Sequence, residues 1–126
     1  MLNTQLKQVR DFFKAFSIPF NTEPTNISKD RYLLRYELAQ EELDEYLVAC
    51  KENNITEIAD ALTDQAYILF GSFVEHGMQY KFEELFAEVN RSNMSKLDEN
   101  GKPIYRKDGK VMKGKGYFKP DFSRIL

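Results

Sequence analysis

Residues 36–50, YELAQEELDEYLVAC, and residues 57–71, EIADALTDQAYILFG, decide the fold. In both stretches apolar residues recur three and four positions apart, and no proline interrupts them, which is typical of α-helices. Only the six residues KENNIT at 51–56 separate the two. The sequence therefore predicts two long helices that form an antiparallel hairpin, with its turn at about Asn53.

The acidic residues of the first stretch fall on two faces of its predicted helix. At about 100° per residue, Glu42 and Glu45 share a stripe with Leu38 and other apolar residues. The opposite, polar side carries the remaining acids, which are Glu37, Glu41 and Asp44. Glu42 and Glu45 are therefore expected to face inward.

The second helix repeats this arrangement. Glu57, Asp60 and Asp64 share one face with Ile68 and Gly71, and most of the other faces are apolar. Residues at equal distances from the turn of a hairpin lie at equal heights, so the acids of the two helices are expected to face each other across a short gap.

A group of inward-facing carboxylates has to be neutralised. Isolating a carboxylate from water costs many kcal/mol, so such groups take up protons or bind cations. No lysine lies within this group, which favours a metal. Ligation by oxygen alone selects hard cations, so Mg²⁺ is predicted, with Mn²⁺ as the other candidate.

Four patterns in fixed order carry a family resemblance: EExxE at 41–45, ExxD at 57–60, DALTDxxYxxxG at 60–71 and NxxK at 93–96. Together they span about residues 31–96. They resemble the all-α nucleotide pyrophosphohydrolases, the MazG and phosphoribosyl-ATP pyrophosphohydrolase-like superfamily.

The resemblance implies metal-dependent hydrolysis of a nucleoside triphosphate to the monophosphate and pyrophosphate. The implied metal ligands are Glu42, Glu45, Glu57 and Asp60. Glu41 and Glu42 are the implied catalytic residues, because Glu41 would hold a further metal or the attacking water. The candidate substrate-binding residues are Asp64, Asn93, Lys96 and Arg31, with Arg35 as a further candidate for binding phosphate; Asp64 is also a candidate metal ligand.

The resemblance also implies a homodimer or homotetramer. The predicted helix at 55–74 has almost no solvent face, which agrees with burial between subunits. Residues 98–126 form a Lys- and Gly-rich tail that the phosphoribosyl-ATP enzyme of histidine synthesis ordinarily lacks. That substrate is therefore not assigned, and a house-cleaning role in the nucleotide pool is expected.

The whole chain of 126 residues is expected to form one all-α domain, an antiparallel bundle of four to five helices with a small C-terminal β-hairpin. The helical core is predicted for about residues 1–97. Residues 3–16 and 79–95 are its outer helices, and Asn93 and Lys96 continue the apolar stripe of the second. In the tail, segments 103–106 and 110–113 flank Lys-Asp-Gly and predict the hairpin.

Composition excludes several classes of partner. Eighteen basic and 20 acidic residues give a net charge of -2, which provides no electrostatic footprint for duplex nucleic acid or an anionic membrane. The single cysteine, Cys50, excludes an intramolecular disulfide, and the first residues lack a long apolar run. The expected location is the cytoplasm.

Other interpretations of these patterns remain. Asn54 and Glu57 fit a capping box, so Glu57 could serve only to stabilise the start of its helix. A di-iron bundle needs Glu-x-x-His, which the only histidine, His76, does not provide. The stretch at 98–103 opens like a calcium loop but has glycine at the wrong position. The alternative in another functional class is a non-catalytic helical interaction module that retains the fold.

Overall fold

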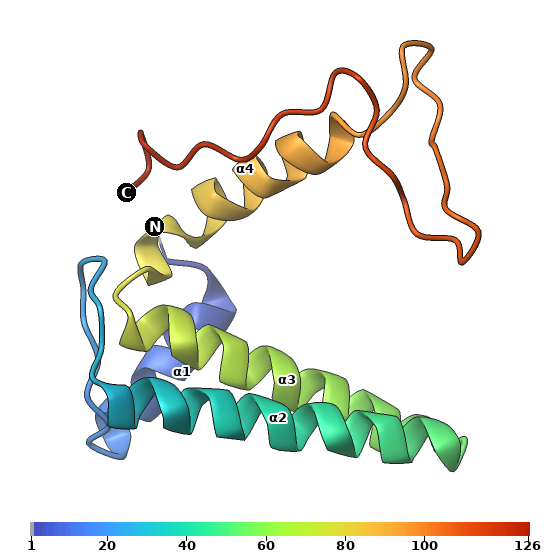
Figure 1. Ribbon diagram of the computed structural model, residues 1–126. Helices are drawn as coiled ribbons and strands as arrows, with labels where there is room; N and C mark the ends of the chain where they lie inside the picture. Colours follow the sequence, from blue (N-terminus) through green and yellow to red (C-terminus); the bar gives the residue numbers. More distant parts are fainter. Residues whose placement is uncertain (1) are drawn as a thin grey trace. The chain divides into compact units, whose positions relative to one another are not determined.

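The computed structural model describes residues 2–126, which form two compact units, one ending at Tyr80 and the other comprising Lys81–Leu126. The first holds α1 (Thr4–Ala15), α2 (Lys29–Lys51) and α3 (Ile55–Glu75). A short 3-10 helix, η1 (Gln79–Lys81), leads to α4 (Phe82–Met94) in the second unit (Figure 1). The predicted all-α class is confirmed, with four α-helices among the described residues.

The long helices α2 and α3 lie side by side and antiparallel, as predicted (Figure 1). Their connection is a compact turn in which Asn53 takes a left-handed conformation with a φ of 52°. The Asn53 N–H donates to Cys50 O and the Asn54 N–H donates to Ala49 O, both at 3.1 Å. This pair of bonds is the Schellman motif, which satisfies the last carbonyls of α2 and reverses the chain at once.

Helix α1 supplies the apolar face that covers α3. Leu6, Val9 and Phe13 recur at helical spacing and are almost completely buried. On α3, Ala61 and Val74 are buried as well. Removal of these side chains from water stabilises the unit, by about 1.5–3 kcal/mol for a fully buried large aliphatic or aromatic residue.

Arg35 connects α2 to α3 over a glycine. Its guanidinium donates from Nη2 to Ile68 O at 2.5 Å and from Nε to Ser72 Oγ at 3.1 Å. A Cβ on Gly71 would collide with this guanidinium, so the absence of a side chain there lets Arg35 cross α3. Burial, the largest influence, lowers the pKa of Arg35 from its usual value.

One turn further toward the start of α2, Arg31 makes a second connection. Its Nε and Nη2 donate to the two carboxylate oxygens of Glu75 at 2.8 and 2.6 Å. The Glu75 side chain is only 2% exposed. A buried carboxylate needs such a partner, so this bidentate ion pair fixes the axial register of α2 against α3.

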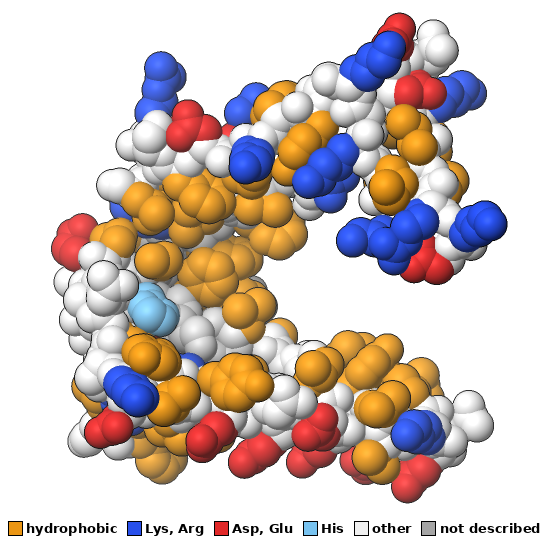
Figure 2. Space-filling view, viewed as in Figure 1, with side chains coloured by type: hydrophobic (Ala, Val, Ile, Leu, Met, Phe, Trp, Pro, Cys, Tyr) orange, Lys and Arg blue, Asp and Glu red, His pale blue; other side chains and the backbone are white. Residues whose placement is uncertain are grey.

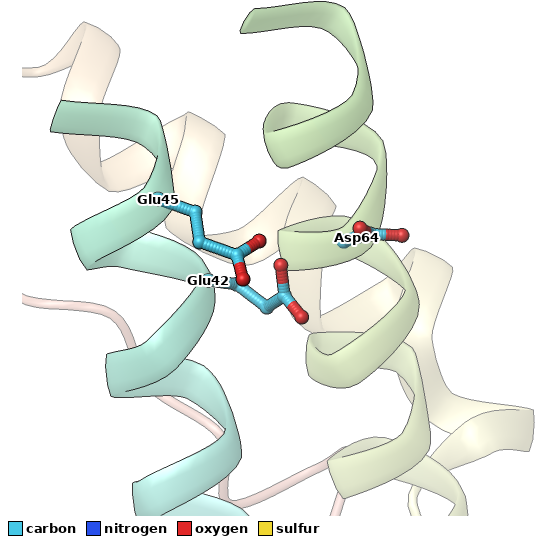
Figure 3. Close-up of side chains that lie close together, drawn as sticks. All are labelled: Glu42, Glu45 and Asp64. Carbon is cyan, nitrogen blue, oxygen red and sulfur yellow. The ribbon is translucent and has the colours of Figure 1, made fainter. Parts of the chain in front are cut away.

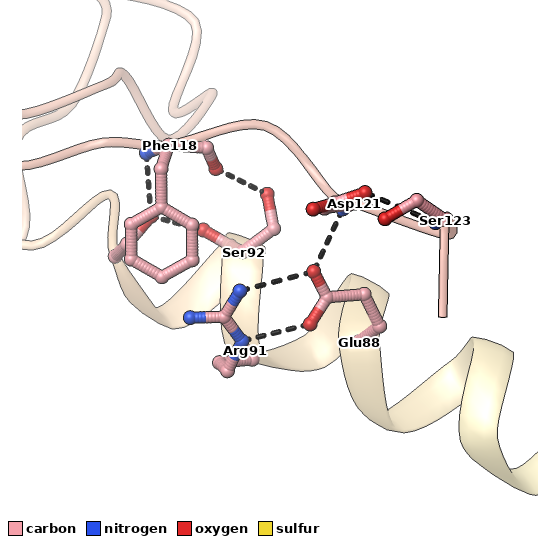
Figure 4. Close-up of polar contacts among 7 residues, drawn as sticks. Glu88, Arg91, Ser92, Phe118, Asp121 and Ser123 are labelled. Atoms are coloured by element: carbon pink, nitrogen blue, oxygen red, sulfur yellow. Dashed lines mark hydrogen bonds and ion pairs between the residues drawn. The ribbon is translucent and has the colours of Figure 1, made fainter. Parts of the chain in front are cut away.

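In the second unit, the C-terminal tail lies along α4 (Figure 4). Ser92 Oγ donates to Phe118 O at 2.7 Å, and the Asp121 N–H donates to Glu88 Oε2 at 2.7 Å. Glu88 also accepts two hydrogen bonds from Arg91, whose guanidinium lies 4.3 Å from the centre of the Phe118 ring. The bonds from Arg91 first, and then the one from Asp121, lower the pKa of Glu88 to about 2.

The prediction of a C-terminal β-hairpin is wrong, because the two strands do not form. Within residues 2–126 the structure has no named strand, and at this place it has one isolated antiparallel bridge between Tyr105 and Val111. The turn itself is present, with Gly109 at a φ of 89°. The flanking segments are short and largely exposed, so they bury too little apolar surface to extend a two-stranded ladder.

Across residues 2–126, no helix combines the length and apolar character needed to cross a membrane.

Candidate active site

Three carboxylates from two helices meet at the gap between α2 and α3, where Glu42 and Asp64 are half-buried and Glu45, which was predicted to face inward, is exposed. Glu42 and Glu45 project from α2, and Asp64 lies opposite them on α3 (Figure 3). One oxygen of each can be chosen so that all three lie within 4.8 Å of one another. We refer to Glu42, Glu45 and Asp64 as the acidic triad.

Small residues allow the two helices to approach near the triad. Ala49 on α2 and Ala61 on α3 are 3% and 2% exposed. A larger side chain at either position would separate the helices and widen the gap between their carboxylates. The helix pattern thus delivers both the acids and the close packing that holds them together.

The triad is electrostatically strained. Burial, contact with the Glu45 carboxylate, and the charges of Asp64 and Asp60 raise the pKa of Glu42 from 4.5 to about 7. Burial, followed by the charges of Asp60 and Glu45, also raises the pKa of Asp64. Negative groups crowded in a partly dry gap favour either a proton or a cation.

One oxygen of the triad lacks a partner. Glu42 Oε2 is buried and accepts no hydrogen bond from any described residue. Such an atom costs free energy unless something outside the chain satisfies it. The donor set consists of carboxylate oxygens alone, so the group can bind a metal ion and fits a hard cation.

Beside the triad lies a hollow of about 480 Å³ between α2 and α3. Its acidic lining residues include Glu45, Glu57 and Asp60, so it contains three of the four predicted metal ligands. The remaining lining residues are Asp44, Val48, Ala49, Glu52 and Ala61. The hollow offers room for a ligand next to the carboxylates.

The residues that form the triad differ from the metal ligands that the sequence motif predicts. Asp64, predicted as a substrate contact or a metal ligand, belongs to the triad itself. Asp60 lies outside the triad, although its charge affects both Glu42 and Asp64. Glu41 is exposed and also lies outside it.

Glu57 occupies the position that the capping interpretation foresees. Its backbone N–H donates to the side chain of Asn54, the N-cap of α3, at 3.1 Å. Its carboxylate is exposed on the first turn of the helix, where a negative charge is favourable. Glu57 also lines the hollow, so the capping role and a role in ligand binding are compatible.

Sequence reasoning assigned Asp44 to a solvated face and did not single out Glu52, yet both line the hollow. Asp44 accepts a hydrogen bond from Gln40 at 3.0 Å and is exposed. Asp44, Val48 and Glu52 are spaced four residues apart, so they form one stripe of α2. That spacing was the signal that could have identified them.

The arginines that were candidates for binding phosphate are engaged elsewhere. Arg31 is paired with Glu75, and Arg35 is bound to α3 at Ile68 and Ser72. Both make contacts that hold the helices together, which accounts for their place on the same stripe as Glu42.

Asn93 and Lys96 belong to the second unit, at the end of α4. Both were predicted to point toward the core. Lys96 is half-buried, whereas Asn93 is exposed. They line a cavity of about 340 Å³ together with Met94, Leu97, Pro103 and Val111.

Comparison with known proteins agrees with the sequence patterns. The family model described as phosphoribosyl-ATP pyrophosphohydrolase matches residues 9–93. A solved structure of a "putative NTP pyrophosphohydrolase" from Exiguobacterium sp. 255-15 is 29% identical in sequence to this chain. The match covers 95% of this chain and 90% of that one, with a TM-score of 0.45. No curated protein sequence matches. The family match covers most of the chain, including the entire α2–α3 hairpin and its acidic triad, so this chain belongs to the phosphoribosyl-ATP pyrophosphohydrolase family.

Proposed function

We propose that the protein is a metal-dependent nucleoside triphosphate pyrophosphohydrolase. The reaction adds water across the bond between the α- and β-phosphates and yields the nucleoside monophosphate and pyrophosphate. Family membership supports this class of hydrolase. The observation that carries the proposal is the acidic triad, in which Glu42 Oε2 is buried beside two further carboxylates and has no hydrogen-bond partner within residues 2–126.

Glu42, Glu45 and Asp64 would hold the metal, with Asp60 and Glu57 at the adjacent hollow as additional ligands. Mg²⁺, or Mn²⁺ in its place, would neutralise triphosphate charge and lower the pKa of a bound water. The chain itself contributes a fixed set of negative oxygens on two rigid helices, so the ligands are oriented before substrate arrives. Glu41, which directly precedes Glu42 in the sequence, is the residue that we assign to a further metal or the attacking water.

The tail beyond the family match supports our choice of substrate class. That match ends at residue 93, and the Lys- and Gly-rich tail beyond it departs from the pattern expected of the histidine-synthesis enzyme. We therefore assign a nucleoside triphosphate rather than phosphoribosyl-ATP, and a house-cleaning role in the nucleotide pool.

A homodimer or homotetramer forms part of the proposal. Large apolar residues of α2 and α3 are exposed in the single chain, among them Leu43 at 50% and Leu69 at 56%. Hydrophobic side chains gather over this hairpin, and acidic ones line its edge (Figure 2). An apolar groove of about 450 Å³ runs between the two helices. Exposed apolar area of this kind is typical of subunit interfaces, and sedimentation at micromolar concentration tests it; a clean monomer contradicts it.

Release of pyrophosphate from canonical and modified nucleoside triphosphates, with and without Mg²⁺, tests the activity. We expect Glu42→Gln to lower the rate by about a thousandfold or more, since it removes a ligand charge while keeping the shape of the side chain. Glu37→Gln is the matched control, because Glu37 is exposed on the same helix away from the triad. If no triphosphate is hydrolysed by the wild type with either metal, the interaction-module interpretation replaces the enzyme.

A further inference from the structure

The charges of the chain are divided unequally between its two units. The first unit, which ends at Tyr80, carries seven basic and 13 acidic residues, whereas the second carries 11 basic and seven acidic ones. Their net charges are therefore -6 and +4. The small net charge of the whole chain conceals this basic half, and such an asymmetry indicates an anionic partner.

The positive excess of the second unit lies in residues 98–119, which we call the basic loop. This loop holds seven basic and three acidic residues. Two of the acidic residues form ion pairs, Asp108 with Arg106 and Glu99 with Lys115. The other basic residues of the loop form no ion pair within residues 2–126; they are Lys102, Lys107, Lys110, Lys113 and Lys119.

Backbone contacts hold the basic loop in a defined shape. The Gly114 N–H donates to Lys96 O at 2.9 Å, and the Arg106 N–H donates to Lys110 O at 2.8 Å. Residues 101–113 are all exposed, and Lys and Arg side chains gather on this part of the surface (Figure 2). The cations are thus displayed on an ordered backbone, so less conformational entropy is lost when they bind a partner.

Aromatic rings lie among these cations. Tyr105, next to Arg106, is 64% exposed. Tyr117 is half-buried, and the ammonium nitrogen of Lys113 lies 4.7 Å from the centre of its ring. Proteins that bind single-stranded nucleic acid combine these two features, because bases stack on aromatic rings while cations neutralise the phosphates.

The structure of the loop favours a single strand over other polyanions. A duplex is usually read by a helix or a two-stranded ribbon that enters the major groove. Among the described residues the loop has one isolated β-bridge, and the helix before it, α4, begins with the acidic residues Glu83 and Glu84. An anionic membrane is typically bound by an amphipathic helix, and residues 98–119 contain no helix.

We infer that the basic loop binds single-stranded nucleic acid, DNA or RNA, with phosphates at its unpaired lysines and bases stacked on Tyr105 and Tyr117. The inference is independent of the proposed function, because it involves no carboxylate of the triad and no hydrolysis. It gives the protein a second ligand, which is recognised by charge and stacking and not by base sequence.

Fluorescence anisotropy of labelled oligo(dT) and oligo(U), each of about 12 nucleotides, tests the inference with the chelator-treated full-length protein. The two oligonucleotides distinguish DNA from RNA. We expect binding at low salt, and the logarithm of the affinity should fall linearly with the logarithm of the salt concentration.

Lys107→Gln combined with Lys110→Gln removes two unpaired cations of the loop. This variant should weaken binding at least tenfold and reduce the salt slope by about 1.4, since each phosphate contact to a single strand contributes about 0.7. Lys7→Gln combined with Lys14→Gln is the matched control, because it removes the same charge from exposed positions of α1. The control should change the affinity less than twofold.

Tyr105→Leu separates stacking from charge. It should weaken binding about fivefold or more and leave the salt slope unchanged. No binding of either oligonucleotide at low salt, or equal weakening by the control on α1, overturns the inference. Binding to vesicles of anionic lipid without binding to oligonucleotides would assign the loop to a membrane surface, and displacement of the oligonucleotide by an equal concentration of nucleoside triphosphate would assign it to single nucleotides; either result overturns the inference. Pyrophosphate release is measured separately and tests only the proposed function.

Discussion

Replacing Glu42 with glutamine should stabilise the metal-free protein at the same time as it abolishes hydrolysis. The pKa of Glu42 is raised from 4.5 to about 7 in the folded state, mainly by burial. A raised carboxyl pKa means that the folded protein holds this proton more tightly than the unfolded chain does. The stability that the proton provides is complete below about pH 4.5 and is lost as the pH rises through about 7. Glutamine does not titrate, so the stability of the Glu42→Gln protein should not decrease in this way as the pH rises.

The size of the effect follows from the shift. At about 1.4 kcal/mol per pKa unit, the change from 4.5 to about 7 corresponds to about 3.5 kcal/mol. Solvent reaches the half-buried carboxylate and screens its charge, so we expect about 2–3 kcal/mol at pH 8. For a domain of this size that is an increase in Tm of about 5–10 °C, against at most a few degrees at pH 5.

Thermal unfolding of metal-stripped wild type and Glu42→Gln at pH 5 and pH 8 measures this directly. Glu37→Gln, on the exposed side of α2, is the control and should match wild type at both values. A Glu42→Gln protein that is less stable than wild type at pH 8, or a difference that does not grow with pH, would refute the electrostatic account of the triad.

Three further outcomes are expected. Adding millimolar Mg²⁺ or Mn²⁺ to the stripped wild type should raise its Tm, since only the folded state assembles the triad; an unchanged melting curve argues against the site. Gly71→Ala should lower the unfolding free energy by about 1–3 kcal/mol in denaturant titrations, because the new methyl group meets the Arg35 guanidinium; wild-type stability would contradict this packing. Arg31→Lys should also destabilise the folded protein, because lysine cannot reproduce the two hydrogen bonds to Glu75, but it should leave KM for the triphosphate unchanged. A raised KM at unchanged stability would indicate that Arg31 binds the substrate.

Much of the α2–α3 hairpin could be predicted from the sequence. The helical periodicity gave both helices, and the position of Asn53 gave the turn, because a left-handed residue at a helix end is a local property. The inward phase of Glu42 depends only on the geometry of one helix, whereas Glu45, predicted to face inward as well, is exposed although its carboxylate reaches the triad. Those predictions needed no knowledge of how the helices cross.

The remaining features depend on that crossing. Whether Asp60 or Asp64 joins Glu42 depends on the axial register of two helices, which the contacts of Arg35 and Arg31 set. A positive charge on an inward stripe indicates a buried partner but does not identify it. The sequence offered phosphate as that partner, and the structure provides the backbone of α3 and Glu75. The hairpin prediction failed for another reason, because turn residues specify a reversal without ensuring that strands extend from it.

The compact turn at Asn53 has a consequence for the order of events in folding. Every carboxylate of the triad lies within one helical hairpin, so the contacts that assemble it are short in sequence and little loop entropy has to be overcome to form them. Repulsion among these charges should therefore slow the pairing of α2 with α3 at neutral pH, and a divalent cation that binds both helices should accelerate it. The refolding rate would then depend on metal concentration.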